Sequence, residues 1–438
     1  MSSWFVYALV FLIPVGMKKY LYSFTSGVSD YHSIFLFGID VLLVVFLVIW
    51  GIRTIKWNAV TKLLLVFSLL GLFPILWSSN AWLIVFKWFH LLLFILFALS
   101  VAALLEKGTI KLKAILWLLV ISSVLQSIVG FFQFGAQASV GLHLLGESFI
   151  TPLTKGVARV GVGDLSFLRI YGTMPHANIL AAFLVMGLVA AIGLLFLGEK
   201  KRWKNALLGL CIFSLLGGLL LTFSRSGWIV TALSIAALLV YGFFTKSLRA
   251  RIFFLSGVIL VTFAALFIQF GWLVFPRAHF TAEEPSVDHR VRYNTIGAEL
   301  LLHHPFGVGW GNQILTAAEE GLYGEQGLSL SWQEQPIHNL YILIATESGI
   351  VGIAAFLIFL FLVFRSTFRR FKETRGGETA HEIFVCGVLL GGLLLFGLVD
   401  HFMWDLEAGQ LMFWLAVGLL LGVGFSSGVI GASASQKK

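Results

Sequence analysis

The sequence predicts an all-α membrane protein, a helical bundle with about twelve spanning helices of roughly 20 apolar residues each. Three observations lead to this fold class. Of the 438 residues, 59% are hydrophobic, 15% aromatic and only 12% charged, and a soluble protein needs far more charge to cover its surface. The apolar residues form long runs. The loops between these runs are alternately rich and poor in lysine and arginine, which is typical of a chain that crosses a membrane repeatedly.

The apolar runs divide the chain into three membrane blocks, two long loops and a tail. Five spanning segments are predicted within residues 1–134, four within 177–275 and three within 337–427. The first long loop covers 135–176, the large loop 276–336 and the polar tail 428–438. The individual segments are expected at 4–22, 33–51, 62–78, 81–104, 112–134, 177–198, 205–223, 226–245, 252–275, 337–364, 382–399 and 407–427.

The N-terminus and the cysteines carry little further signal. Met-Ser-Ser-Trp lacks the basic region of a signal peptide, so we expect the first apolar run to be retained as a membrane segment. Cys211 and Cys386 both lie inside apolar runs. Neither a structural disulfide nor a cysteine metal site is therefore expected.

The basic residues predict the orientation. Most of the 30 lysines and arginines fall in loops on one side of the predicted membrane. The positive-inside rule makes that side cytoplasmic, with both termini inside and both long loops outside. The large loop holds three arginines against eight acids, so it is not a basic patch for nucleic acid. Within it, Tyr293–His304 is predicted as a short amphipathic helix that Pro305 ends.

The stretch Gln335–Gly352 is the first candidate for chemistry. His338 and Asn339 are predicted at the start of a long apolar helix, with Pro336 in its first turn. A helix N-terminus disfavours imidazolium and attracts phosphate. His338 would then be a neutral base beside an anion site, as transfer from a phosphate-linked donor requires. The alternative is a histidine that only caps a helix at the membrane boundary.

Arginines on the outer face are candidates for the anion site, because a guanidinium binds phosphate through a fixed fork of donors. Arg225 lies in a tight turn, Leu-Thr-Phe-Ser-Arg-Ser-Gly-Trp, and Arg290 and Arg292 lie in Asp-His-Arg-Val-Arg. Arg169 precedes a predicted helix that begins near His176. The alternatives are a snorkelling side chain for Arg225, loop ion pairs for Arg290 and Arg292, and capping or headgroup contacts for Arg169.

Glu347 is an ionisable residue deep in a predicted span, which by default suggests function. It follows His338 by nine residues, or two and a half helical turns, so the two side chains should point to opposite faces. We therefore expect a structural or supporting part for Glu347. The adjacent His303 and His304 are not expected to bind a metal.

Five motifs follow one another in a fixed order: Thr222-Phe-Ser-Arg-Ser-Gly, Arg290, Pro305-Phe-Gly-Val-Gly-Trp-Gly, His338-Asn-Leu-Tyr and Glu347-Ser-Gly-Ile-Val-Gly. In this the chain resembles the O-antigen ligase and O-antigen polymerase superfamily of bacterial membrane glycosyltransferases, most strongly over residues 165–410. Two departures stand out. Ile229 follows Ser-Gly-Trp where many ligases have leucine, and Pro-His-Ala-Asn stands where the family often has Pro-Asn, which leaves the role of His176 open.

The resemblance implies an inner-membrane fold of the C type of glycosyltransferases, with the active site facing the periplasm and with neither metal nor cofactor. The donor would be a glycan on undecaprenyl pyrophosphate. The acceptor hydroxyl would belong to lipid A core in a ligase, or to a second lipid-linked repeat unit in a polymerase. By position, His338 corresponds to the base, and Arg225 with Arg290 or Arg292 to the pyrophosphate clamp. Arg169, His176 and Asn339 are further substrate-binding candidates.

Two functional alternatives remain at this point. The motifs do not separate a ligase from a polymerase. A flippase or transporter of lipid-linked glycans would place ionisable groups and broken helices at mid-membrane. Only Asp40, Lys87 and Glu347 are candidates at such depth, whereas His338 and the arginines gather on one face, which favours chemistry at the membrane surface. Four aromatic residues are possible sugar-stacking walls: Trp310, Tyr323, Trp332 and Trp404.

Overall fold

The fold is described from a computed structural model, which covers residues 2–424 except 26, 28, 79, 155, 163–164, 199–200, 279–284, 329 and 331–332. The predicted tail at 428–438 and Trp332 lie outside the described residues. The strands are β1 (Lys18–Ser23), β2 (Ser33–Phe37), β3 (Arg159–Val162) and β4 (Leu165–Leu168). The helices are α1 (Ser2–Phe11), α2 (Gly38–Phe46), α3 (Ala59–Leu70), α4 (Ala81–Glu106), α5 (Leu112–Ala136), α6 (Ala177–Leu197), α7 (Arg202–Leu221), α8 (Arg225–Phe244), α9 (Arg249–Ala278), α10 (Pro285–His303), α11 (Gln313–Glu319), α12 (Leu322–Glu325), α13 (Leu340–Glu373), α14 (Glu378–Phe396), α15 (Phe402–Asp405) and α16 (Glu407–Gly424).

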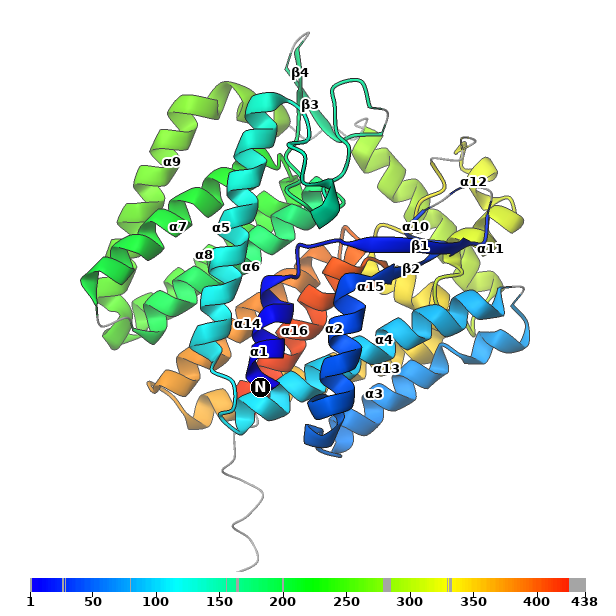
Figure 1. Cartoon of the computed structure of the whole chain (residues 1–438), viewed down its shortest axis with the longest axis horizontal. Coiled ribbons are helices and arrows are strands. Elements are labelled where there is room, and N and C mark those ends of the chain that lie inside the picture. The colour runs from blue at the N-terminus through cyan, green and yellow to red at the C-terminus, as the bar shows by residue number, and fades with distance from the viewer. Residues whose placement is uncertain are drawn as a thin grey trace, which may run out of the picture.

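The predicted all-α membrane fold is confirmed. Ten helices of the described chain are long and apolar enough to cross a membrane, and the two small antiparallel hairpins β1–β2 and β3–β4 are the sheet structure found there. In Figure 1, α5 to α9 form one side of the bundle and α2, α3, α4 and α13 form the other, with α1, α14 and α16 between them. The N-terminus lies at the opposite end of the bundle from β3 and β4.

The first two predicted spans, 4–22 and 33–51, are wrong as continuous spanning helices. Helix α1 ends at Phe11, and the chain then forms β1, which pairs with β2. Helix α2 therefore begins only at Gly38. It continues as a π-helical segment over Leu47–Gly51 and a 3-10 turn over Ile52–Thr54. A ten-residue helix is about 15 Å long, half of a bilayer core. The residues of β1 and β2 are mostly apolar or aromatic, so hydropathy alone does not separate this hairpin from a helix.

Small residues bring the central helices close together. Every residue of α6 is buried, and a side chain at Gly187 would meet Ser123 of α5 at 2.4 Å. In the same way, a Cβ at Gly418 of α16 would lie 2.6 Å from the carbonyl oxygen of Ala98 in α4. Small residues at helix contacts are typical of membrane proteins, where backbones approach closely to gain van der Waals contact.

The large loop folds into a small unit beside the bundle. Its helix α10 confirms the predicted amphipathic helix, begins earlier, at Pro285, and buries Ile296 and Leu300. These two side chains pack with residues of α11 and α12 in a second hydrophobic cluster.

The glycine-rich segment after α10 seals a break in α13. Gly349 has φ 72° and ψ −179°, which interrupts the helix. Val308 and Gly309 donate their backbone N–H groups to the carbonyls of Thr346 and Glu347, each at 2.9 Å. These bonds satisfy carbonyls that the break would otherwise leave without partners. Two motifs far apart in sequence, Pro305–Gly311 and Glu347–Gly349, thus form one structural element.

Candidate active site

A cavity of about 810 Å³ lies between the first long loop, the α7–α8 turn, α10 and the connection between α14 and α16. Among the described residues, two acids line it, Asp30 and Asp400, against five arginines: Arg159, Arg169, Arg225, Arg277 and Arg290. We call it the arginine cavity. His176 and His338 also line it. Most of the predicted site residues are therefore brought together, from parts of the chain more than 100 residues apart.

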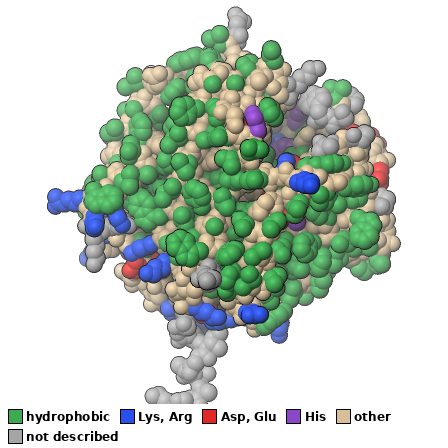
Figure 2. Space-filling view, viewed as in Figure 1, with side chains coloured by type: hydrophobic (Ala, Val, Ile, Leu, Met, Phe, Trp, Pro, Cys, Tyr) green, Lys and Arg blue, Asp and Glu red, His purple; other side chains and the backbone are tan. Residues whose placement is uncertain are grey.

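Figure 2 draws the face of the molecule that is seen in Figure 1. A hollow on this face has histidine side chains inside it and lysine or arginine side chains at its rim. Most other lysines and arginines visible there lie along the left and lower edges of the molecule. The hollow and most of the basic side chains visible in this view thus lie on different parts of the molecule.

His338 precedes α13, whose N-cap is Asn339. Pro336 comes before the helix and not in its first turn, so that prediction is wrong. The Nδ1 atom of His338 lies 2.8 Å from the carbonyl oxygen of Pro336. A carbonyl can only accept, so Nδ1 carries the proton and Nε2 keeps the lone pair. The ring stacks on Tyr293 of α10, with centroids 5.0 Å apart and planes at 14°.

Electrostatics keep His338 neutral. Burial, together with the positive charges of His401 and Arg290, lowers the pKa of His338 to about 3, although Asp400 acts in the other direction. A buried imidazole without a close acid partner loses the hydration that stabilises its charged form. The ring is therefore in the form that can accept a proton on Nε2.

Arg225 is held at the first position of α8 by an unusual turn. Phe223 has φ 46°, a left-handed conformation that is rare for a bulky residue. Ser224 is the N-cap, and its hydroxyl accepts the N–H of Gly227 at 3.2 Å. Strained turns of this kind persist where neighbouring structure fixes them. Here the carbonyl of Thr222 accepts a hydrogen bond from Arg169 at 2.6 Å.

Arg290 and Arg292 diverge in the structure. Arg290 lines the arginine cavity. Arg292 bonds Asp288 at 2.7 Å and the carbonyl of Gln326 at 2.6 Å, within the large loop. Residues that are two positions apart in a helix, such as 290 and 292, are separated by about 200° around its axis. The two side chains therefore leave α10 on opposite sides.

Arg169 starts a chain of buried hydrogen bonds. Besides Thr222, it donates to the side-chain oxygen of Asn178 at 2.6 Å, and Asn178 donates to Asp400 at 3.0 Å. Burial alone would raise the pKa of Asp400, but the charges of His401 and Arg290 lower it below its usual value. Asp400 is thus an ionised carboxylate within a cavity of positive charge.

His176 is the N-cap of α6, and its Nδ1 accepts the N–H of Asn178 at 3.2 Å. Burial, with the charge of Arg169, lowers the pKa of His176 to about 4, so the ring is neutral and its Nε2 carries the proton. His176 and His338 therefore differ in their tautomers. His176 offers a donor nitrogen, and His338 offers an acceptor nitrogen.

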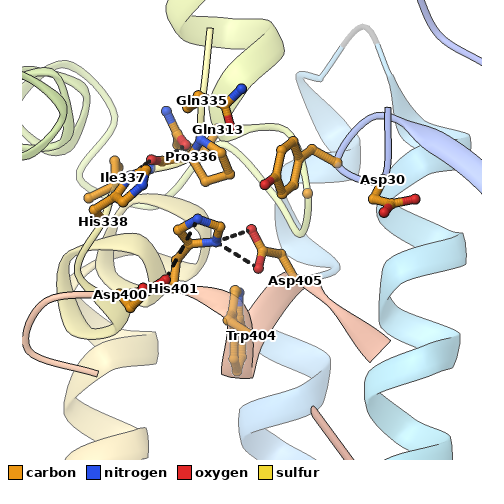
Figure 3. Close-up of polar contacts among 12 residues, drawn as sticks. Asp30, Gln313, Gln335, Pro336, Ile337, His338, Asp400, His401, Trp404 and Asp405 are labelled. Carbon is orange, nitrogen blue, oxygen red and sulfur yellow. Dashed lines mark hydrogen bonds and ion pairs between the residues drawn. The ribbon is translucent and has the colours of Figure 1, made fainter. Parts of the chain in front are cut away.

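Three site residues that were not predicted from the sequence lie in the tight turn between α14 and α16. Asp400 and His401 line the arginine cavity. His401 Nδ1 lies 2.8 Å from Asp405, and its ring centroid is 4.8 Å from that of His338. Burial works against a charged His401, but Asp405 and Asp400 raise its pKa above the usual value. Figure 3 shows the His401 ring between Asp400 and Asp405, below the segment that ends in His338.

A signal for this turn exists in the sequence: two acids and a histidine occur within six residues between two apolar runs. Arg277 was also missed as a site residue, since it ends α9 at the edge of a long loop. Its Nε lies 3.5 Å from the carbonyl of Phe223, so it contacts the same turn as Arg169.

Other predicted residues lie outside the arginine cavity. Asn339 accepts the N–H groups of Tyr341 and Ile342 and donates to Leu398, as a cap does. Glu347 is buried and accepts hydrogen bonds from Gly311 and Trp404, at 2.9 and 2.8 Å, which suits a structural part. Trp310, Tyr323 and Trp404 are buried and do not line the arginine cavity.

Metal ligands do not gather in the part of the chain that the structure describes: it holds no group of three or more His, Cys, Asp or Glu suited to a metal ion. His303 and His304 instead contact Glu320 at the surface of the large loop.

Fold and site together define a class: a polytopic α-helical membrane protein whose polar site is an arginine-lined cavity at one end of the bundle. Residues 208–357, about a third of the chain, match the model of a family described as O-Antigen ligase, which supports the resemblance to the O-antigen ligase superfamily. The matched part contains Arg225, Arg290 and His338. Members of this family are glycosyltransferase-like enzymes, ligases or polymerases, with lipid-linked glycans and lipid-anchored acceptors as substrates. No curated protein matches the chain.

Proposed function

We propose that this protein is a ligase-type membrane glycosyltransferase, which moves a glycan from undecaprenyl pyrophosphate to an acceptor hydroxyl at the periplasmic face of the inner membrane. The observation that carries the proposal is the arginine cavity, which combines His338, an imidazole with a free Nε2 lone pair, with five guanidinium groups. Guanidinium forks suit a diphosphate, and a neutral imidazole suits the removal of a hydroxyl proton.

The reaction is one in-line displacement. His338 Nε2 takes the proton of the acceptor hydroxyl while that oxygen forms a bond to the anomeric carbon. The bond from that carbon to the phosphate oxygen breaks, and its electrons leave with the lipid diphosphate. A single displacement inverts the anomeric configuration. Arg225 and Arg290 are the clamps on the leaving diphosphate, because charge develops there in the transition state.

The other cavity residues have supporting parts in this mechanism. Arg169 and Arg277 both bond backbone carbonyls of the Thr222–Phe223 turn, so they position Arg225. His176 can donate Nε2–H to a phosphate or sugar oxygen. Arg292 binds within the large loop and has no part in the clamp. The arginines supply the positive charge that a metal ion provides in other transferases, so the mechanism is metal-independent.

The test offers purified protein in proteoliposomes one lipid-linked glycan donor in buffer with EDTA. Two acceptors are supplied in parallel, lipid A core and a second lipid-linked repeat unit. Growth of lipid A core, with inverted linkage, is the expected result. Growth of the second repeat unit alone would identify a polymerase. Movement of the donor across the bilayer with no new glycosidic bond would identify a flippase and would refute the proposed transfer.

A further inference from the structure

A second cavity, of about 700 Å³, borders the arginine cavity. The two share Asp30, Pro175 and Leu406 as lining residues. The second cavity lies between the β1–β2 hairpin, the first turns of α4, the loop at 143–149 and the start of α16. Its volume is within the usual range for a small-molecule site. We call it the carboxylate cavity.

Its charges differ from those of its neighbour. Four carboxylates line it, with three lysines and no arginine among its described lining residues: Asp30, Glu147, Asp405 and Glu407, against Lys18, Lys19 and Lys87. This charge balance does not suit a diphosphate. Carboxylates instead accept hydrogen bonds from hydroxyl groups. The chemistry therefore points to a neutral ligand that is rich in hydroxyls.

One carboxylate is available for such a ligand. Asp30 pairs with Lys18, Asp405 bonds His401, and Glu147 accepts the N–H groups of Val140 and Leu142. Glu407 is 9% exposed, and its Oε1 has no hydrogen-bond partner among the described residues. A buried carboxylate oxygen without a partner is costly unless a ligand or water satisfies it. Since Glu407 lines the cavity, the cavity supplies the room for that partner.

Aromatic side chains complete the lining. Phe35, Phe37, Phe86 and Phe149 all border the space. His143 stacks on Phe149, with centroids 3.6 Å apart, and so holds that ring at the rim. Apolar and aromatic walls with a few polar groups are typical of pockets that bind one oriented ligand.

The carboxylate cavity also lies next to the candidate base, His338. Asp405 lines it and bonds His401, and His401 lies against His338 in the arginine cavity. A hydroxyl that crosses the shared border at Pro175 and Leu406 therefore arrives on the side of the candidate base.

We infer that the carboxylate cavity binds the acceptor as a neutral, hydroxyl-rich glycan, with Glu407 accepting a hydrogen bond from one of its hydroxyls. The inference rests on the proposed function. It gives donor and acceptor separate cavities, one for the diphosphate and one for the sugar that receives the glycan. The shared border is then the place where the new bond forms.

Binding can be tested without catalysis by thiol protection. The two native cysteines lie in α7 and α14 and line neither cavity. In a Cys211→Ala, Cys386→Ala background, Ser148→Cys reports on the carboxylate cavity, and Ala158→Cys on the arginine cavity. The full-length protein in nanodiscs is labelled with a maleimide in the presence of lipid A core, a lipid-linked repeat unit or undecaprenyl pyrophosphate.

We expect undecaprenyl pyrophosphate to slow labelling of the Ala158→Cys thiol only, lipid A core to slow that of the Ser148→Cys thiol only, and the lipid-linked repeat unit to slow both. Because a polymerase accepts the repeat unit instead, protection of the Ser148→Cys thiol by the repeat unit alone also supports the inference. An acceptor that protects only the Ala158→Cys thiol overturns it, as does the lack of protection of the Ser148→Cys thiol by either acceptor. These outcomes do not depend on whether a glycosidic bond forms.

A kinetic variant gives the second readout. Glu407→Leu, which removes the acceptor oxygens, should raise the acceptor KM about tenfold, the value of one hydrogen bond, and leave the donor KM unchanged. An equal rise in both constants, or a rise in the donor KM alone, would contradict an acceptor site. Failure of the wild-type protein to form any glycosidic bond would instead refute the proposed function.

Discussion

The Nδ1 atom of His338 lies 2.8 Å from the carbonyl oxygen of Pro336, and this contact fixes which nitrogen of the ring is free. The proton sits on Nδ1, so Nε2 is the base. Pro336 has no backbone N–H of its own, and the turn that it begins aims its carbonyl back at the ring. The short segment before α13 therefore orients the histidine, and α13 itself is anchored by the Asn339 cap.

Arg290 and Arg292 form a matched pair for testing the clamp. Arg290→Ala should lower kcat/KM for the donor by about 30-fold or more, because it removes charge-assisted hydrogen bonds to the diphosphate. Arg292→Ala loses a partly exposed ion pair with Asp288, worth at most about 1 kcal/mol. Its kcat/KM should stay within about twofold of wild type. Steady-state kinetics with varied donor will measure both, and the reverse ranking would assign the clamp to Arg292.

The pH dependence should lack the acid limb of an ordinary histidine. A base works in its deprotonated form, so activity is present above its pKa and is lost as the pH falls through that value. Burial, His401 and Arg290 lower the pKa of His338 to about 3 in the empty cavity. We expect kcat/KM to stay level from pH 8 down to about pH 5. A fall centred near pH 6.5 would mean that the base is exposed, or is another group.

Asp405→Asn should move the loss of activity at low pH to a higher pH, closer to neutral. Asp405 raises the pKa of His401, and positive charge on His401 in turn lowers that of His338. Without the carboxylate, His401 is neutral more often and repels the protonated form of His338 less. The groups that face this pair, Asp400 and Arg290, are unchanged by the substitution. A pH profile identical to wild type would show that His401 does not tune the base.

Gly349 should not tolerate a side chain. Its φ of 72° and ψ of −179° belong to a region that is essentially restricted to glycine. A Cβ there would also lie 2.5 Å from the carbonyl carbon of Phe306. Gly349→Ala should lower the free energy of unfolding by about 3 kcal/mol or more.

The control for Gly349 is Gly387→Ala in α14, where an added Cβ meets nothing within 4 Å. It should change stability by no more than about 1 kcal/mol, in the stabilising direction, since alanine favours helix. Thermal unfolding in detergent will compare the two. Equal melting temperatures would show that the seal between Pro305–Gly311 and α13 contributes little.

Much of the fold follows from hydropathy, because a bilayer forces each spanning segment to be both long and apolar. Ten predicted segments overlap the ten spanning helices, most of them within about four residues at each end, although α13 runs on to Glu373, beyond the predicted end at 364. The N-terminal hairpin could not be predicted in this way. Tyr20, Leu21 and Phe35 suit a membrane helix and a strand equally well, and the pairing of β1 with β2 depends on tertiary contacts.

The site was partly predictable for a similar reason. Charge is rare in this chain, so His338, Arg225 and Arg290 were conspicuous in the sequence. The choice between Arg290 and Arg292 needed the helical phase of α10, which begins earlier than its hydrophobic pattern indicates. The part that His401 and Asp405 play in the site could be seen only in the folded structure, because their partner His338 is more than 60 residues away in the chain.

The most direct test of the central claim is single-turnover transfer by His338→Ala in proteoliposomes, at saturating donor and acceptor. The account predicts a rate at least about 100-fold below wild type, as expected for the loss of a general base. Protection of the Ala158→Cys thiol by undecaprenyl pyrophosphate should be unchanged in this variant. Transfer at the wild-type rate would contradict the account, because His338 could then not be the base.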